Sequence, residues 1–181
     1  MRIVSGTHKG RIITPPKNFK ARPTTDFAKE NLFNILNNNF DFSEVTVLDI
    51  FSGTGSIAYE FASRGSQHVI SVEKNFKHQS FIKKTIDNLG LTQIKSIKTD
   101  AFRFIKSCNE QFDIIFADPP YDLEELESIP EFIFDFKILK KNGWLIVEHG
   151  EKTNFSNQKG FKEQRKYGGV NFSIFEHYET Q

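Results

Sequence analysis

Cysteine is nearly absent from this sequence, and its scarcity excludes several kinds of protein. Cys108 is the only cysteine among 181 residues, so the chain can form neither an internal disulfide nor a cysteine-based zinc cluster. The five histidines are scattered, without an HExxH motif or any other pair at metal-ligand spacing. We therefore expect no metal site. Because Cys108 follows a short amphipathic stretch, we expect it to be an inert thiol.

Long hydrophobic runs are also missing. No segment approaches the roughly 18 consecutive apolar residues that a transmembrane helix needs. The N-terminus is basic but lacks the apolar stretch of a secretory signal. The sequence therefore predicts a cytoplasmic protein that does not act at a membrane, with a length suited to one domain-sized core.

Net charge is close to zero because two opposite excesses cancel. Residues 1–25 hold six of the 24 basic residues and no acidic one, whereas residues 26–181 hold all 23 acidic residues and are net negative. Such an asymmetry is typical of proteins that bind nucleic acid. We expect the basic side chains of the N-terminal segment to contact phosphates. They are Arg2, Lys9, Arg11, Lys17, Lys20 and Arg22.

The body of the chain alternates between strand and helix patterns. Short apolar runs predict strands at 45–50, 69–72, 94–97, 113–117 and 144–147. Helical periodicity between them predicts helices at 56–63, 76–89, 101–107 and 124–139, the last broken at Pro130. Strands that are apolar on both faces and alternate with helices indicate an α/β fold with a parallel sheet.

Both ends of the chain depart from this alternation. Residues 1–5 and 10–14 predict an N-terminal β-hairpin, and a helix is predicted at 27–36, with Thr24 or Thr25 as its cap. Residues 160–166 and 170–178 alternate around a Gly-Gly pair and predict an antiparallel C-terminal hairpin. We therefore divide the chain into a basic hairpin extension, residues 1–25, and an α/β domain, residues 26–181.

A glycine-rich turn follows the strand predicted at 45–50. Residues 49–58 read DIFSGTGSIA, a strand that runs into Gly53 and Gly55 and then into a helix. Glycine allows a ligand to approach the backbone closely, and the first turn of the helix presents unpaired N–H groups. The segment also fits GxGxxA, so an enzyme that uses a nicotinamide cofactor remains an alternative at this point.

Acidic residues stand at the ends of successive predicted strands. Asp49 closes the first strand of the domain, Glu73 closes the second, and Asp100 follows the third. In a parallel sheet these ends lie at the edge where ligands bind. Glu73 lies eighteen residues after Gly55, where a carboxylate can accept hydrogen bonds from a ribose diol.

The fourth strand leads into the tetrad Asp118-Pro119-Pro120-Tyr121. Two prolines make a stiff turn whose carbonyl oxygens can face a ligand. Asp118 and the Pro119 carbonyl can accept hydrogen bonds from an exocyclic amine while Tyr121 stacks on its ring. Such contacts make the amine a better nucleophile toward an electrophilic methyl group. A hydride-transfer enzyme has no evident use for the tetrad, which weighs against the nicotinamide alternative.

Together these motifs resemble those of the RsmD-like 16S rRNA (guanine-N2)-methyltransferases, a family of S-adenosylmethionine-dependent class I methyltransferases. The resemblance runs nearly end to end and is carried by residues 1–6 with 9–11, 22–26 with 30–33, 49–55, 118–121 and 167–168. Where the family has arginine after Asp26 and before Glu30, this chain has Phe27 and Lys29.

The resemblance implies a Rossmann-like sheet and methylation of the N2 amine of a guanine in 16S rRNA. The residues it implies for binding S-adenosylmethionine are Asp49, Phe51, Ser52, Gly53, Gly55, Glu73, Lys74, Asp100 and Ala101. Those it implies for binding and activating the guanine amine are Asp118, Pro119, Pro120 and Tyr121. The residues that we expect to bind RNA are the basic residues of the N-terminal segment and Thr24, that is Arg2, Lys9, Arg11, Lys17, Lys20, Arg22 and Thr24. We expect a monomer whose substrate is ribosomal RNA, within a small ribosomal subunit or an assembly intermediate.

Two alternatives remain open. An adenine amine fits the same tetrad, so an adenine-N6 methyltransferase acting on DNA or RNA is one of them. The other is a non-catalytic RNA-binding protein that has kept the fold, although intact Gly53, Gly55, Asp118 and Tyr121 argue against a loss of catalysis. Identifying the methylated nucleoside separates the first alternative from our prediction, and cofactor binding separates the second.

Overall fold

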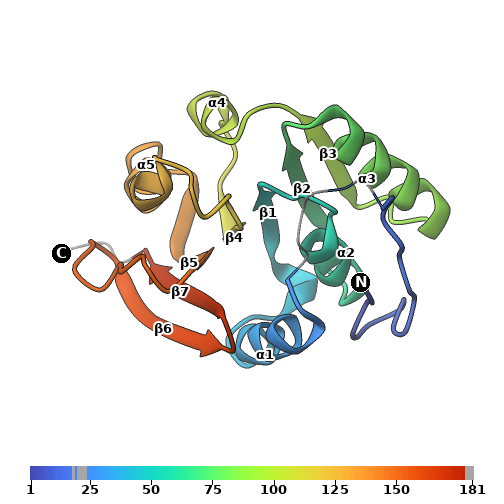
Figure 1. Cartoon of the computed structure of the whole chain (residues 1–181), viewed down its shortest axis with the longest axis horizontal. Coiled ribbons are helices and arrows are strands. Elements are labelled where there is room, and N and C mark those ends of the chain that lie inside the picture. Colours follow the sequence, from blue (N-terminus) through green and yellow to red (C-terminus); the bar gives the residue numbers. More distant parts are fainter. Residues whose placement is uncertain (18, 20–23, 178–181) are drawn as a thin grey trace.

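A seven-stranded sheet runs through the centre of the molecule (Figure 1). This computed structural model describes residues 1–17, 19 and 24–177, so the predicted RNA contacts Lys20 and Arg22 lie outside the described residues. The strands are β1 (Thr46–Ile50), β2 (His68–Glu73), β3 (Ile94–Lys98), β4 (Phe112–Ala117), β5 (Leu139–His149), β6 (Phe161–Tyr167) and β7 (Val170–Glu176). Their order across the sheet is β3-β2-β1-β4-β5-β7-β6.

The strands β1 to β5 run parallel to one another, and β6 and β7 form an antiparallel pair at one end of the sheet. β1 pairs in parallel with β2 and β4, β2 with β3, and β4 with β5. β7 pairs antiparallel with both β5 and β6. Gly168, with φ of +64°, makes the tight turn between β6 and β7. The predicted α/β sheet, parallel with a C-terminal antiparallel hairpin, is therefore confirmed.

Helices cover both faces of this sheet (Figure 1). α1 (Asp26–Asn37), α2 (Ser56–Ser63) and α3 (Phe76–Leu89) contribute to one hydrophobic core, and α4 (Ala101–Ser107) and α5 (Ile129–Asp135) contribute to the other. Val47 of β1 belongs to the first core and its neighbour Leu48 to the second. Burial on both faces explains why the strand sequences are almost wholly apolar. Among the described residues, no helix is long and apolar enough to cross a membrane.

Two predicted elements have different boundaries in the structure. The prediction of a helix over 124–139 is wrong, because a short 3-10 helix, η2 (Leu126–Ser128), precedes α5, which ends at Asp135. Pro130 lies in the first turn of α5, where its missing N–H leaves no hydrogen bond unmade. The strand predicted at 144–147 is only part of β5, which has 11 residues and continues to His149.

The N-terminal hairpin is present as a short antiparallel pairing. One isolated bridge joins Arg2 to Ile12, and neither run is long enough to form a named strand. Ile3 and Ile13 are buried and belong to the same hydrophobic core as α1 and α2. Apolar side chains therefore anchor the basic segment to the body of the protein.

A buried ion pair also holds this segment in place. The Glu60 carboxylate, on α2, accepts hydrogen bonds from the backbone N–H groups of Val4 and Ser5 at 2.8 and 3.0 Å. The ammonium of Lys29, on α1, lies 3.8 Å from Glu60 and donates to the backbone carbonyl of Arg2. Burial lowers the pKa of Lys29, while the Glu60 carboxylate opposes that change. Lys29 thus helps to pack the N-terminal segment.

Two glycines of the N-terminal segment allow this packing to be tested. Gly6 and Gly10 both have a left-handed backbone, with φ of +81° and +83°. A Cβ at Gly6 would lie 1.8 Å from the backbone oxygen of Ser63, whereas a Cβ at Gly10 would meet nothing within 4 Å. Alanine at either position costs roughly 1–2 kcal/mol of backbone strain, and at Gly6 we expect about 1–3 kcal/mol more from the clash.

Chemical denaturation of Gly6→Ala and Gly10→Ala measures the difference, because the shared strain cancels. Equal losses in the free energy of unfolding would contradict the contact between the N-terminal segment and α2.

Candidate active site

The carboxyl ends of the parallel strands meet at a cavity of about 1300 Å³. Its walls come from residues that follow β1, β2, β3 and β4, from the end of β5, from the start of α1 and from the β6–β7 turn. This is the edge at which open parallel sheets bind ligands. All of the predicted cofactor and catalytic residues line the cavity except Gly55 and Ala101. Gly55 is the N-cap of α2, and Ala101 is the buried first residue of α4.

The glycine-rich loop after β1 lines the cavity with Gly53, where no side chain covers the backbone. Phe51, Gly53 and Gly55 have φ of +63°, +54° and +80°, a left-handed conformation that favours glycine. A Cβ at Gly55 would come within 2.6 Å of the Tyr59 ring. The loop is therefore shaped for glycine by both its dihedral angles and its close packing.

Asp49 places a buried carboxylate at the end of β1. It is 1% exposed, and its Oδ2 atom has no hydrogen-bond partner among the described residues. Burial raises the pKa of Asp49 to about 7, and the neighbouring Glu73 carboxylate adds to the rise. An unpaired buried acceptor lowers stability. Its presence in a cavity indicates a place for a ligand that donates hydrogen bonds, and a cation suits it best.

The carboxylates that end β2 and follow β3 are held by neighbouring groups. Glu73 accepts a hydrogen bond from the N–H of Gly53 at 2.8 Å, which ties it to the glycine loop. Asp100 accepts from the N–H of Arg103 at 3.2 Å and pairs with the Lys74 ammonium at 3.3 Å. Burial alone would raise the pKa of Asp100, but these two partners hold it below its ordinary value. The Arg103 N–H and the Lys74 ammonium therefore both stabilise the ionised form of Asp100.

The tetrad follows β4 and forms another wall of the cavity. Pro119 is buried, whereas Pro120 is exposed and Tyr121 is 51% exposed. The pKa of Asp118 is raised well above its ordinary value by burial and by repulsion from the carboxylates of Glu148 and Asp49. A carboxylate with a raised pKa is a better proton acceptor than an ordinary aspartate.

Glu148, near the end of β5, is a candidate functional residue that the sequence analysis missed. It is 4% exposed and lines the cavity together with the tetrad. Its Oε2 atom accepts from the Thr24 hydroxyl at 2.7 Å, and its Oε1 atom accepts from the Tyr121 hydroxyl at 3.3 Å. The signal was present in the sequence, because Glu148 lies next to the last residue of its strand, as Asp49 does. The predicted strand stopped one residue too early to include it.

Aromatic rings stand at the mouth of the cavity. Phe27, at the start of α1, is 64% exposed, and its ring packs edge-on against Tyr167 with centroids 6.2 Å apart. Both residues line the cavity, as does the exposed Tyr121. Exposed aromatic faces of this kind can stack on unpaired bases.

The predicted RNA contacts separate into two groups. Thr24 lines the cavity but is buried, and its hydroxyl orients Glu148. The predicted basic contacts that the structure describes are all exposed, and none of these four lines the cavity. They are Arg2, Lys9, Arg11 and Lys17. The Arg2 guanidinium pairs with the Asp26 carboxylate at 3.4 Å. Their contact with RNA stays a prediction. In the described part of the chain, no group of three or more histidine, cysteine or acidic side chains could hold a metal ion.

Residues 1–176 match the model of the family described as Conserved hypothetical protein 95. The chain belongs to this family. Proteins named Ribosomal RNA small subunit methyltransferase D resemble it over most of their length. One from Buchnera aphidicola subsp. Baizongia pistaciae is 28% identical, and the match covers 97% of this chain and 91% of that protein. The one from Haemophilus influenzae is 32% identical and covers 82% and 78%. The predicted membership among RsmD-like class I methyltransferases is therefore confirmed.

Solved structures support the same fold. The Thermus thermophilus protein TTHA0928 superposes with a TM-score of 0.87 at 22% identity, covering 98% of this chain and 99% of its own. SMU.776, which was crystallised with S-adenosylhomocysteine (SAH), superposes with a TM-score of 0.69 at 16% identity, covering 82% of this chain and 49% of its own. At these identities the likeness establishes the fold.

Proposed function

We propose that this protein transfers a methyl group from S-adenosylmethionine to the N2 amine of a guanine in the RNA of the small ribosomal subunit. Its family and the names of its relatives support methylation of ribosomal RNA. The choice of guanine rests on one observation in particular, the presence of Glu148 beside the tetrad.

S-adenosylmethionine is the methyl donor, as predicted, and the cavity has features that fit it. The unpaired Oδ2 atom of Asp49 can accept a hydrogen bond from the α-ammonium group of the methionine part. The Glu73 carboxylate, fixed to the N–H of Gly53, can accept from the ribose hydroxyls. Asp100 and the first turn of α4 remain the predicted contacts of the adenine. When bound, the donor supplies a methyl group made electrophilic by its sulfonium centre.

The raised pKa of Asp49 leads to a pH-dependent affinity for the donor. The ammonium binds the ionised carboxylate, and Asp49 loses this form as the pH falls through about 7. Below that value the dissociation constant should rise, approaching tenfold for each further pH unit. Calorimetry between pH 5.5 and 8.5 measures the trend, which we expect Asp49→Asn to flatten while also weakening binding at pH 8. A pH-independent dissociation constant in the wild type would contradict the pairing.

The tetrad supplies the groups that activate the target amine. Asp118 and the Pro119 carbonyl accept hydrogen bonds from the two N–H groups and align the nitrogen lone pair with the methyl carbon. Stacking on Tyr121 keeps the base in this plane. As the N–C bond forms and the S–C bond breaks, the nitrogen becomes positive and gives up a proton. Asp118 can accept that proton because its pKa is raised.

Glu148 distinguishes guanine from adenine by the hydrogen bonds that each base offers. Beside its exocyclic amine, guanine presents a donor, N1–H, whereas adenine presents an acceptor, N1. The wall formed by Asp118, the Pro119 carbonyl and Glu148 is rich in acceptors. It therefore complements the N1–H and N2–H₂ edge of guanine, while the N1 lone pair of adenine would face a carboxylate.

The direct test is to identify the methylated nucleoside. Purified protein, labelled S-adenosylmethionine and either small subunits or protein-free ribosomal RNA are incubated together, and the RNA is digested and analysed by mass spectrometry. We expect N2-methylguanosine. N6-methyladenosine would replace our proposal with the adenine alternative, and donor binding without any methylated product would support the non-catalytic one.

A further inference from the structure

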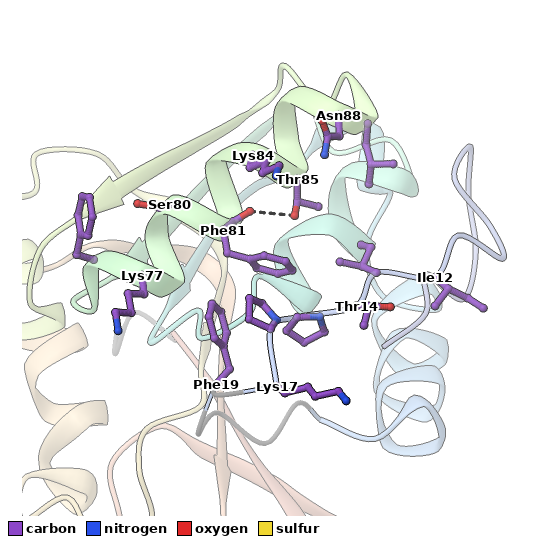
Figure 2. Close-up of a pocket in the computed structure, with 15 residues that line it drawn as sticks. Ile12, Thr14, Lys17, Phe19, Lys77, Ser80, Phe81, Lys84, Thr85 and Asn88 are labelled. Carbon is purple, nitrogen blue, oxygen red and sulfur yellow. Dashed lines mark hydrogen bonds between the residues drawn. The ribbon is translucent and has the colours of Figure 1, made fainter.

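A second hollow, which we call the α3 groove, lies outside the active-site cavity. It has a volume of about 1000 Å³, and it runs between α3 on one side and residues 12–17 and 19 on the other (Figure 2). None of the described residues that line it also lines the cavity. The two hollows are nevertheless neighbours, because Lys74 and Asn75 line the cavity while the next residues, Phe76 and Lys77, line the groove.

The α3 groove carries positive charge without balancing acids. Its described lining includes Lys17, Lys77 and Lys84 and no aspartate or glutamate. Lys77 and Lys84 are seven residues apart on α3, which separates them by about 10 Å along the helix axis at 1.5 Å per residue. They can therefore contact different phosphates of an extended strand. Such a lining favours a polyanion over an acidic side chain or a single small anion.

Aromatic rings are interleaved with these lysines. Phe19 and Phe81 pack edge-on with centroids 5.4 Å apart, and Figure 2 shows both rings inside the groove. Phe76 is 64% exposed, with the ammonium of Lys98 5.3 Å from its ring centroid. Phe19 and Phe81 are half-buried, so Phe76 is the exposed ring among these lysines. An exposed ring beside lysines can bind single-stranded nucleic acid, through base stacking and phosphate contacts.

We propose that the α3 groove binds a single-stranded segment of the substrate RNA that flanks the target nucleotide. This inference rests on the proposed function, since it takes RNA to be the substrate. A strand in the groove would continue past Lys77 and Phe76 toward the cavity. Phe19 lies at the boundary between the groove and the cavity. Its ring packs on the ring of His78, which lines the cavity, with centroids 4.4 Å apart. The groove thus extends the RNA-binding surface from the N-terminal segment to α3.

The test compares two double variants with the same change in charge. Lys77→Gln with Lys84→Gln removes two groove lysines, whereas Lys83→Gln with Lys95→Gln removes two exposed lysines outside the groove. The probe is a fragment of protein-free small-subunit RNA that the wild type methylates, and its dissociation constant is measured against salt. We expect the groove variant to bind more weakly and to lose about 1.4 from the slope of log K against log salt, at 0.7 per phosphate contact. The control should match the wild type.

A third variant tests the stacking part of the proposal. Phe76→Ala should weaken RNA binding about tenfold, as expected for one lost base stack, with an unchanged salt slope. Calorimetry with S-adenosylmethionine checks that all three proteins keep the cavity intact.

Equal RNA affinities and salt slopes for the groove variant and its control would overturn the inference. So would a groove variant that binds protein-free RNA normally but binds assembled small subunits poorly, because the partner of the groove would then be a protein. A wild type that neither binds nor methylates RNA would instead contradict the proposed function.

Discussion

Replacing Asp118 by alanine should abolish nearly all methyl transfer while leaving the fold intact. The substitution removes an acceptor that aligns the amine, and it removes the carboxylate whose raised pKa suits it to accept the proton. General-base and electrostatic contributions of this kind each account for about 10² to 10⁴ in rate. We therefore expect the single-turnover rate at saturating donor and RNA to fall about 10³-fold or more. Rapid-quench measurement with labelled S-adenosylmethionine gives this rate directly.

Two further variants make the result specific to Asp118. Asp122→Ala removes a nearby exposed carboxylate that does not line the cavity, so it should react at the wild-type rate. Asp118→Asn keeps an oxygen that can accept one N–H but loses the basic site, so its rate should lie between those of the wild type and Asp118→Ala. A near-normal rate for Asp118→Ala with the donor bound would show that another group activates the amine.

The pH profile offers an independent check on the same residue. The pKa of Asp118 is raised by burial and by repulsion from Glu148 and Asp49. The ionised form is needed for catalysis, so the single-turnover rate should fall as the pH drops through this raised pKa, above the range of an ordinary aspartate. The titration of Asp49 changes the affinity for the donor, so measuring at saturating donor removes its effect from the rate. The acidic limb should disappear in Asp118→Asn.

The parallel core could be predicted from the sequence because its strands are buried on both faces. Burial of that kind produces apolar runs such as 45–50 and 113–117, and helices between them keep a clear period. The same logic placed Asp49, Glu73 and Asp118 at one edge of the sheet, and the structure brings all three to one cavity. Local pattern and topology were sufficient there.

The missed features depend on contacts between distant parts of the chain. Glu148 lies near the end of β5, just after the apolar run of this strand. Antiparallel pairing with β7 continues β5 beyond that run. Thr24 is a cap candidate by sequence, but in the structure Thr25 caps α1 and the Thr24 hydroxyl reaches Glu148, 124 residues away. Charge counting likewise identified a basic segment, but it gave no indication that Lys17 would line the same groove as two lysines of α3.

Changing Glu148 to glutamine should weaken the preference for guanine over a base that lacks N1–H. The informative substrate is RNA with 2-aminopurine at the target position, because this base keeps the 2-amine but has an unprotonated N1. The wild-type carboxylate can accept from N1–H of guanine and repels the N1 lone pair of 2-aminopurine. The amide that Glu148→Gln introduces would be able to donate to that lone pair, and Thr24 and Tyr121 could still contact its side chain.

The quantity to measure is the ratio of kcat/KM for guanine to that for 2-aminopurine, in the wild type and in Glu148→Gln. Comparing ratios cancels the different intrinsic reactivities of the two amines. A hydrogen bond to a charged group contributes about 1.5–3 kcal/mol, so the ratio should fall by roughly 10- to 100-fold. Glu125→Gln, at an exposed glutamate that lines the same cavity, should leave the ratio unchanged. If Glu148→Gln slows both substrates equally, Glu148 only maintains the shape of the pocket, and the discrimination must come from another contact to the base.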